Sequence, residues 1–147
     1  MPGFTVSGET RAPVEEVWKL LFDPARFPEW WTGIETVRVD RSGEYTVWHD
    51  GRPEFPMPQR LRADRVEGRV AISCQVSEID FSWQLAEQGD GTEITVRVAL
   101  PPAMSDLLDG QREAIGLSLG ALARLAEAET RAAGPRAAGS APRGRRR

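Results

Sequence analysis

A period-two pattern across the middle of the chain limits the possible folds more than any other feature. Between residues 34 and 100, apolar side chains recur at alternate positions, which is typical of strands with one buried face. Residue pairs that end in glycine interrupt the pattern at 42–43, 50–51, 67–68 and 90–91, and such pairs favour turns. The pattern predicts six antiparallel strands, over residues 34–40, 44–49, 57–66, 69–77, 81–87 and 93–100.

Three prolines between residues 52 and 58 mark a segment of a different kind. Proline lacks the N–H that a central strand needs, so we expect a loop or an irregular edge there. This segment is also where we expect a flexible lid, if the chain has one.

The residues before this pattern predict one strand and two short helices. Residues 4–11 alternate roughly, as in an edge strand, and lead into Pro13, which suits the first turn of a helix. Asp23-Pro24 end that helix and start another, because the residue before a proline is pushed out of the helical region. Pro28 suits the start of a second short turn, which carries Trp30 and Trp31. The first helix carries apolar residues at spacings of three and four, namely Val14, Val17, Trp18, Leu21 and Phe22.

The residues after the pattern predict one long helix over 104–130, which follows two prolines at 101–102. The complete order is typical of an α+β helix-grip fold. In that fold, a seven-stranded curved antiparallel sheet wraps around a long C-terminal helix, and two short helices follow the first strand. One helix cannot cover seven strands in a flat sheet. We therefore expect the sheet to curl and to leave a hollow beside the helix.

Length and charge indicate a single acidic domain with a basic tail. A chain of 147 residues with 40% hydrophobic residues suits one soluble domain, which we place at residues 1–131. Residues 132–147 are mostly Gly, Ala, Pro and Arg, a composition that predicts a disordered Arg-rich tail. The domain holds 14 basic residues against 22 acidic ones, and the tail holds five arginines. Such an acidic body opposes nucleic-acid binding.

Several function classes lack the residues that they need. One cysteine and one histidine exclude a disulfide framework and the usual zinc site, so we expect neither a metal nor a cofactor. The longest apolar stretch, over residues 114–123, is too short to span a bilayer, and the chain does not open on a signal-peptide pattern. We expect a cytoplasmic monomer or homodimer without membrane insertion. Eighteen arginines against one lysine fit a GC-rich bacterial genome.

Several short motifs lie at characteristic places in this order of elements. They are Ala12-Pro13-Val14 through Trp18, Asp23-Pro24, Pro28-Glu29-Trp30-Trp31, Trp83, and the Gly91-Thr92-Glu93 turn. Together they resemble the START-like or SRPBCC superfamily, most closely its polyketide cyclase/dehydrase and lipid-transport branch. The resemblance covers residues 4–129 and implies the helix-grip fold. Members of the superfamily include aromatic polyketide cyclases, carriers of lipids and isoprenoids, hormone-binding proteins and activators of a chaperone ATPase.

The resemblance also implies a cavity and some of the residues that line it. Phe27, Trp31 and Trp83 match positions that line the cavity in the aromatic cyclases. Those cyclases carry a Trp-rich, Arg-containing strand in the middle of the sheet. The corresponding segment here, residues 57–62, is interrupted by proline. This difference from the cyclases counts against the cyclase reaction but not against the expected cavity.

His49 and Tyr45 are the candidates for acid–base chemistry. His49 is the only histidine, and it shares strand parity with Tyr45, so both side chains enter the cavity if their face is concave. Such a pair could move a proton to or from an enolised carbonyl. The alternative is that His49, next to the 50–51 turn, lies at a strand end in solvent. Trp48 has the opposite parity and cannot share the inner face without a bulge.

Other residues are candidates for ligand contacts. Trp83 and Phe81 share a face that forms either a cavity wall or plain core beneath the long helix. Arg62 faces solvent, or it binds a carboxylate or ketone if its face is inward. Cys74 alternates with Ile72, which predicts a buried small hydrophobe. The remaining candidates are Gln75 at the end of its strand, and Gln111 and Ile115 on the long helix.

Three functions fit these observations. The first is binding of a small hydrophobic ligand, such as a lipid, an isoprenoid or a polyketide-like metabolite, between the long helix and the sheet. The second is an aromatic polyketide cyclase or dehydratase that uses a cavity Tyr or His. The third is a ligand-free interaction module of the chaperone-activator type, whose cavity would be filled by its own side chains.

Overall fold

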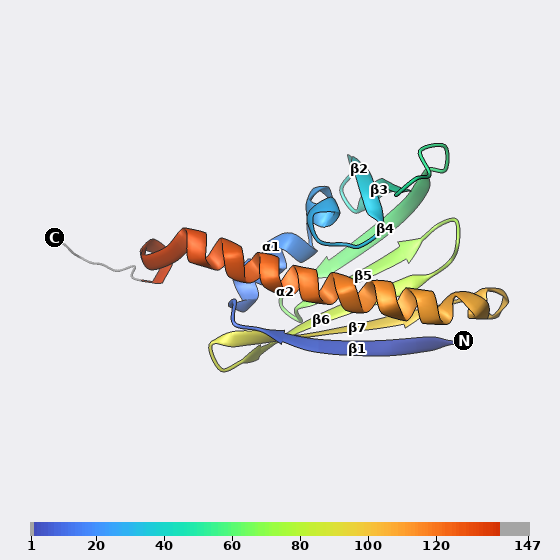
Figure 1. The fold of residues 1–147 in the computed structure, drawn as a ribbon. Coiled ribbons are helices and arrows are strands. Elements are labelled where there is room, and N and C mark those ends of the chain that lie inside the picture. The colour runs from blue at the N-terminus through green and yellow to red at the C-terminus, as the bar shows by residue number, and fades with distance from the viewer. Residues whose placement is uncertain (1, 139–147) are drawn as a thin grey trace.

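Seven antiparallel strands form one curved sheet, and a long helix lies across its concave face (Figure 1). The computed structural model describes residues 2–138, and side chains up to residue 134. The strands lie in the order β1-β7-β6-β5-β4-β3-β2, so each strand pairs with its neighbour in sequence except that β1 pairs with β7. Their bounds are β1 Gly3–Thr10, β2 Ile34–Arg41, β3 Glu44–His49, β4 Met57–Asp64, β5 Arg69–Cys74, β6 Asp80–Gln88 and β7 Gly91–Ala99.

The α+β helix-grip fold is confirmed, with two short helices after the first strand. The second was expected to carry Trp30 and Trp31, but it ends at Glu29, because Trp30 has non-helical backbone angles. Two short helices, α1 (Val14–Leu21) and η1 (Pro24–Glu29), connect β1 to β2. Asp23 separates them, because its carboxylate accepts a hydrogen bond from the Ala25 backbone N–H at 3.1 Å and so begins η1. A short 3-10 turn, η2 (Pro102–Leu107), then leads from β7 into the long helix α2 (Leu108–Ala138).

The long helix differs from its predicted range of 104–130 at both ends. Its first predicted turn belongs to η2, because Met104 has non-helical backbone angles. Its C-terminal end lies beyond residue 131, with a break at Gly134, where φ is 58° and ψ is −148°. The first residues of the predicted tail therefore continue α2. The rest of that tail, residues 139–147, lies outside the described residues.

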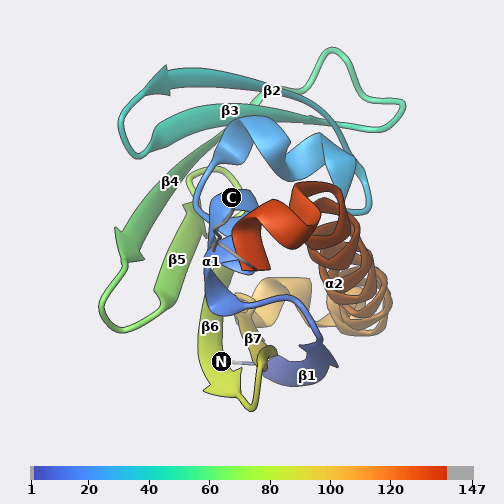
Figure 2. The same cartoon turned by 90° about the vertical axis from the view of Figure 1, so that its left-hand side faces the viewer.

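Curvature of the sheet leaves space on one side of α2. Figure 2 shows β2 and β3 curling over one side of the helix while β1 and β7 lie beneath it. Gly8 on β1 allows the closest approach, since a Cβ atom there would lie 2.5 Å from the Leu119 Cδ2 atom of α2. The helix thus packs mainly on β1 and α1 and leaves the inner faces of β3 to β5 partly uncovered.

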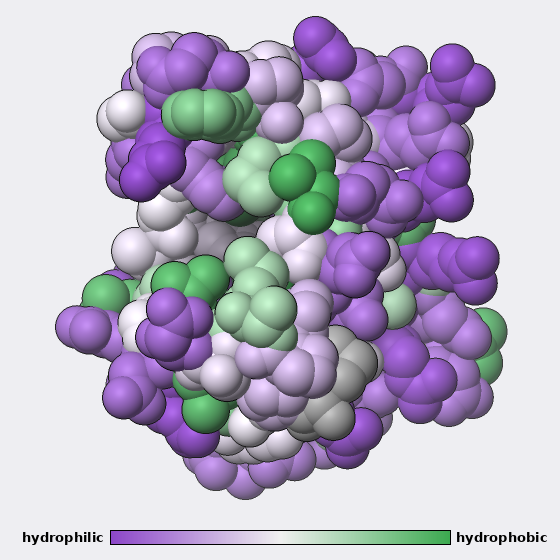
Figure 3. Space-filling view, turned by 90° about the vertical axis from the view of Figure 1, so that its right-hand side faces the viewer, coloured by the Kyte–Doolittle hydropathy of each residue, from purple (hydrophilic) through white to green (hydrophobic). Residues whose placement is uncertain are grey.

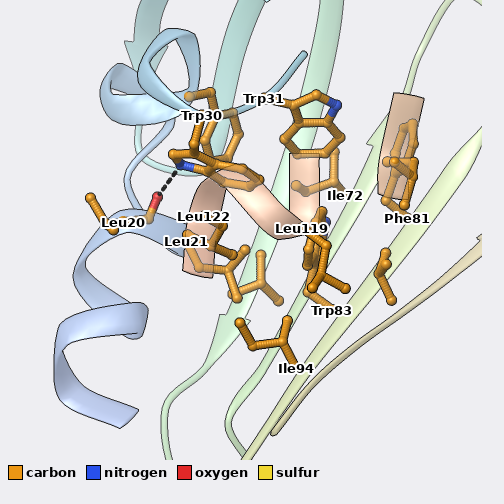
Figure 4. Close-up of a cluster of buried hydrophobic side chains, with 14 of the residues drawn as sticks. Leu20, Leu21, Trp30, Trp31, Ile72, Phe81, Trp83, Ile94, Leu119 and Leu122 are labelled. Carbon is orange, nitrogen blue, oxygen red and sulfur yellow. Dashed lines mark hydrogen bonds between the residues drawn. The ribbon is translucent and has the colours of Figure 1, made fainter. Parts of the chain in front are cut away.

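Aromatic rings from separate elements fill the middle of the core (Figure 4). Trp30 and Trp31 follow η1, and each contacts Trp83 of β6, with ring centroids 5.3 and 5.5 Å apart. The Trp30 indole N–H donates a hydrogen bond to the Leu20 carbonyl at 3.3 Å. These contacts fix η1 against the sheet, so the position of Trp31 is set by packing.

Two strands are shorter than the alternation predicts. The strand predicted over 69–77 ends at Cys74, because residues 75–79 form a turn in which the Glu78 N–H donates to the Cys74 carbonyl at 3.0 Å. Glu78 has a φ of 64°, which the turn requires. The strand predicted over 57–66 ends at Asp64, and Val66 lies in the following turn with 92% of its surface exposed.

Candidate functional site

A pocket of about 500 Å³ lies between the start of α2 and the inner face of the sheet. Figure 3 looks at this end of the molecule and shows a hollow near its middle, bordered by apolar and neutral atoms, with hydrophilic atoms farther out. Apolar side chains supply much of the wall, namely Trp31, Ile34, Met57, Ile79, Phe81, Met104, Leu107, Ala114 and Ile115. Small-molecule sites in proteins typically have such predominantly apolar walls.

Three connections surround the opening of this pocket and together are called the mouth here: loop 50–56 after β3, turn 75–79 after β5, and η2. Each of them exposes one large apolar side chain, and these are Phe55, Val76 and Leu107. Each also exposes at least one carboxylate, and the set consists of Asp50, Glu54, Glu78 and Asp106. Arg52 is the one basic residue in these three connections. The mouth is therefore apolar and acidic at once.

His49 borders the pocket at the end of β3, where it pairs with Ile34 of β2. The side chain is half-buried, and its Nδ1 atom is buried without a hydrogen-bond partner among residues 2–138. Burial lowers the pKa of His49 below its usual value, Arg52 lowers it further, and Asp50 opposes the shift. The imidazole is therefore neutral at pH 7.

Trp48 and His49 lie on different sides of β3, as their opposite parity predicts. The Arg38 guanidinium packs over the Trp48 ring at 5.4 Å on the outer side of the sheet. A register shift in β2 between Ile34 and Thr36, opposite these two residues, bends the edge of the sheet locally. His49 therefore keeps the inner position without bringing Trp48 inside.

Tyr45, the predicted partner of His49, lies deeper and does not border the pocket. Only 1% of its surface is exposed, and its hydroxyl donates to the Gln59 Oε1 atom at 2.8 Å. Burial raises the pKa of Tyr45 well above its usual range, and Cys74 adds to the shift. A phenol that holds its proton so strongly is poorly suited to exchange it, so Tyr45 acts here by holding Gln59.

Gln59 and Cys74 border the pocket, and neither was among the residues predicted to contact a ligand. They face each other across β4 and β5, and both are buried. The sequence held the signal for Gln59, since it alternates with the outward-facing Arg60 and Arg62 and so takes the inner face. A buried glutamine on the inner face of a sheet needs partners for its amide group.

The predicted ligand contacts separate into three groups. Trp31, Phe81, Gln111 and Ile115 border the pocket together with His49. Phe27 and Trp83 are fully buried in the aromatic core and do not border it, because Trp31 lies against both of them. As ligand contacts, all of these residues remain predictions.

Arg62 and Gln75, the third group, are exposed and do not border the pocket. The guanidinium of Arg62 lies on the outer face of β4, opposite in parity to the buried Gln59. Gln75 follows the last residue of β5, so strand parity no longer decides where its side chain points. Its amide donates instead to the Ser73 carbonyl at 3.2 Å.

A second depression, of about 660 Å³, lies where β1 and the β6–β7 turn approach α2. Its wall is polar and includes Glu9, Arg11 and Asp90. The Glu127 carboxylate in this wall already accepts hydrogen bonds from the Thr10 hydroxyl at 2.8 Å and the Arg11 N–H at 2.9 Å. The depression therefore offers little to an apolar ligand.

Within residues 2–138, no group of three His, Cys, Asp or Glu side chains is arranged to hold a metal ion. No helix in the same range combines the length and the apolar character needed to cross a bilayer.

Comparison with known families identifies the chain's relatives. Residues 1–128 match the family described as polyketide cyclase/dehydrase and lipid transport. The chain belongs to this family. This family member has the curved sheet and the long helix described above. A comparison with curated protein sequences gave no match.

Solved structures share the fold of this polyketide cyclase/dehydrase family member. An uncharacterized protein from Bacillus thuringiensis has a TM-score of 0.73 at 15% identity, over 84% of this chain and 98% of that one. A protein from Nitrosomonas europaea has a TM-score of 0.70 at 21% identity, over 86% and 95%. The di-domain ARO/CYC protein BexL, from the BE-7585A biosynthetic pathway, has a TM-score of 0.70 at 18% identity, over 84% of this chain and 46% of BexL. At such identities the likeness establishes the fold.

Proposed function

We propose that this protein binds a small hydrophobic metabolite in the pocket between α2 and the sheet. The observation that carries the proposal is the hollow of about 500 Å³ with a largely apolar wall and a few inward polar groups. The family's description, which joins polyketide cyclases with lipid transport, supports the same class of ligand.

Apolar burial would supply most of the affinity. Each Å² of apolar surface removed from water contributes roughly 25 cal/mol, so a ligand that covers the wall gains from its whole body. The inward polar groups of His49, Gln59 and Gln111 would fix its orientation. This arrangement favours ligands such as lipids, isoprenoids or polyketide-like compounds over small charged metabolites.

Native mass spectrometry of the freshly purified protein tests the proposal directly. A defined additional mass that disappears on denaturation is the expected result. If the protein is bare and no lipid or polyketide mimic changes its tryptophan emission, the proposal is wrong.

Filling the pocket provides the first variant test. Ala114 borders the pocket from α2, so Ala114→Phe should occupy part of the hollow and remove the co-purifying mass. We expect affinity for a hydrophobic probe to fall at least about tenfold, which equals 1.4 kcal/mol. Ala128→Phe is the matched control, because Ala128 is exposed on the same helix away from the pocket. Equal binding by both variants would place the ligand elsewhere.

A second candidate function is an aromatic cyclase or dehydratase, and the pocket position of His49 favours it. A neutral imidazole beside a bound ketone can accept or donate a proton. BexL, which has a similar fold, is described as a di-domain ARO/CYC protein from a biosynthetic pathway, and this description supports the second candidate. An enzyme predicts that His49→Ala spares ligand binding and stops turnover, whereas a carrier predicts that the same change leaves binding near normal and that no product forms in either protein.

The third candidate, a ligand-free interaction module, requires a cavity filled by its own side chains. The hollow in this structure counts against that requirement. A bare protein that binds no probe, together with association through the exposed apolar residues of the mouth, would favour it instead.

A further inference from the structure

Three adjacent strands place a polar group in the wall of the pocket. Tyr45 of β3 pairs in register with Gln59 of β4, and Gln59 pairs with Cys74 of β5. Their exposed fractions are 1%, 7% and 4%. Gln59 and Cys74 border the pocket, with Tyr45 behind them. These three residues are called the polar cluster here.

The amide of Gln59 is held at its oxygen and open at its nitrogen. Its Oε1 atom accepts the Tyr45 hydroxyl hydrogen bond at 2.8 Å, which fixes the orientation of the group. Its Nε2 atom has no hydrogen-bond partner among residues 2–138. The atom is not among the fully buried ones that lack a partner, so it is accessible from the pocket. An apolar ligand that covers this N–H group without offering an acceptor leaves it unsatisfied, which is unfavourable. An oxygen atom on a ligand in the pocket can supply that acceptor, because Gln59 borders the pocket.

The charges around the pocket indicate which oxygen groups fit. Among the described residues that line it, the charged ones are Asp50 and Arg52, and both are exposed at the mouth. None of the described residues places a cation beside the polar cluster to compensate a buried carboxylate, and desolvation of an unpaired charge is costly. A ketone or ester oxygen can accept from Nε2 without that cost.

We propose that Gln59, oriented by Tyr45, selects ligands that carry a neutral carbonyl oxygen on the part that lies against β4 and β5. Gln59 contacts the ligand, and Tyr45 is a positioning residue that acts through it. This inference rests on the proposed function, since it requires a ligand in the pocket. It adds the residue that distinguishes one apolar ligand from another.

Two probes of nearly the same shape test the selection. 2-Acetylnaphthalene carries a ketone oxygen where 2-isopropylnaphthalene carries a methyl group. Binding of each is measured by titration calorimetry to the wild type and to Gln59→Met, Tyr45→Phe and Gln75→Met. We expect Gln59→Met to weaken the ketone about fivefold, the effect of one net hydrogen bond, and to leave the hydrocarbon unchanged. Tyr45→Phe should weaken the ketone by a smaller factor, and 2-naphthoate should bind wild type less tightly than the ketone.

Gln75→Met is the matched control, because Gln75 is exposed outside the pocket and the change should affect neither probe. Equal effects of Gln59→Met on both probes, or no effect on the ketone, would overturn the inference while the proposed function stands. Failure of every probe to bind wild type would overturn both. If Gln59→Met does not fold, the infrared carbonyl stretch of 2-acetylnaphthalene bound to wild type decides instead. A lower frequency than in a hydrocarbon solvent supports the hydrogen bond, and an unchanged frequency overturns it.

Discussion

His49 is the one histidine of the chain, and its half-buried position makes stability depend on pH. Burial lowers the pKa of His49 in the folded state, while its pKa in the unfolded state is about 6.5. Above that value both states are neutral and the full stability is present. Below it the unfolded state binds the proton more readily, so stability falls as the pH decreases.

Substitution of His49 should therefore flatten the pH profile. We expect the urea midpoint of wild type to fall more between pH 7.5 and pH 5.5 than that of His49→Gln. Carboxylates common to both proteins titrate in both, so the difference between the profiles isolates His49. Parallel profiles would show that the imidazole is as well solvated in the folded state as in the unfolded state.

Single side chains show where sequence reasoning reaches its limit. Trp31 and Trp83 lie in contact, yet Trp31 borders the pocket and Trp83 lies wholly in the core. Both are apolar at inward positions, so the alternation that places them inside cannot separate wall from core. Tyr45 was correctly placed on an inner face, but its depth depends on how far the sheet curls. Gln59 carried a readable signal, because buried polar residues on an inner face need partners.

Among the helices, α2 carries glycines whose removal should stabilise it. No atom beyond Gly116's own helix and chain neighbours lies within 4 Å of a Cβ atom built there. Gly116→Ala should raise the free energy of unfolding by about 0.5–1 kcal/mol, since alanine loses less backbone freedom on folding. Thermal and urea unfolding would measure the gain.

Gly8→Ala gives the opposite expectation and serves as the contrast. Its new Cβ atom would lie 2.5 Å from the Leu119 Cδ2 atom, so β1 and α2 would have to separate or the leucine would have to move. We expect a loss of stability there. A gain at both positions would mean that the packing of β1 against α2 is looser than described.

At the level of elements, the order of strands and helices was predictable and their ends were less so. Alternation and proline positions identified seven strands and two short helices, and these are confirmed. The end of β5 was misplaced because residues 75–77 continue the alternation although they belong to a turn. Backbone hydrogen bonds decide that boundary, and alternation does not report them. The error explains why Gln75 lies outside the pocket.

In the whole molecule, Arg26 connects the short helix η1 to the far half of α2. Its guanidinium donates to Glu29 at 2.9 Å and pairs with Glu129, and its side chain is 28% exposed. Both contacts raise the pKa of Arg26 above its usual range, although burial lowers it. The ion pairs therefore hold a segment near residue 26 to one about a hundred residues later.

Arg26→Met should lower the free energy of unfolding by about 1 kcal/mol, in the range of well-formed surface pairs. Added salt should reduce the difference from wild type, because screening weakens the ion pairs in the latter. Arg60→Met, at an exposed position on β4, is the control and should change stability little. A difference that persists undiminished at 1 M salt would mean that Arg26 acts through packing of its methylene chain.

The composition of the mouth has a consequence for how copies of the protein meet in solution. Phe55, Val76 and Leu107 expose apolar surface at the mouth, and in a concentrated sample such surfaces would favour association of the protein. The exposed carboxylates of the mouth are negatively charged on every copy, so two mouths that face each other repel. High salt screens that repulsion. The carboxylates that border the opening should thus also oppose association of two copies through their mouths.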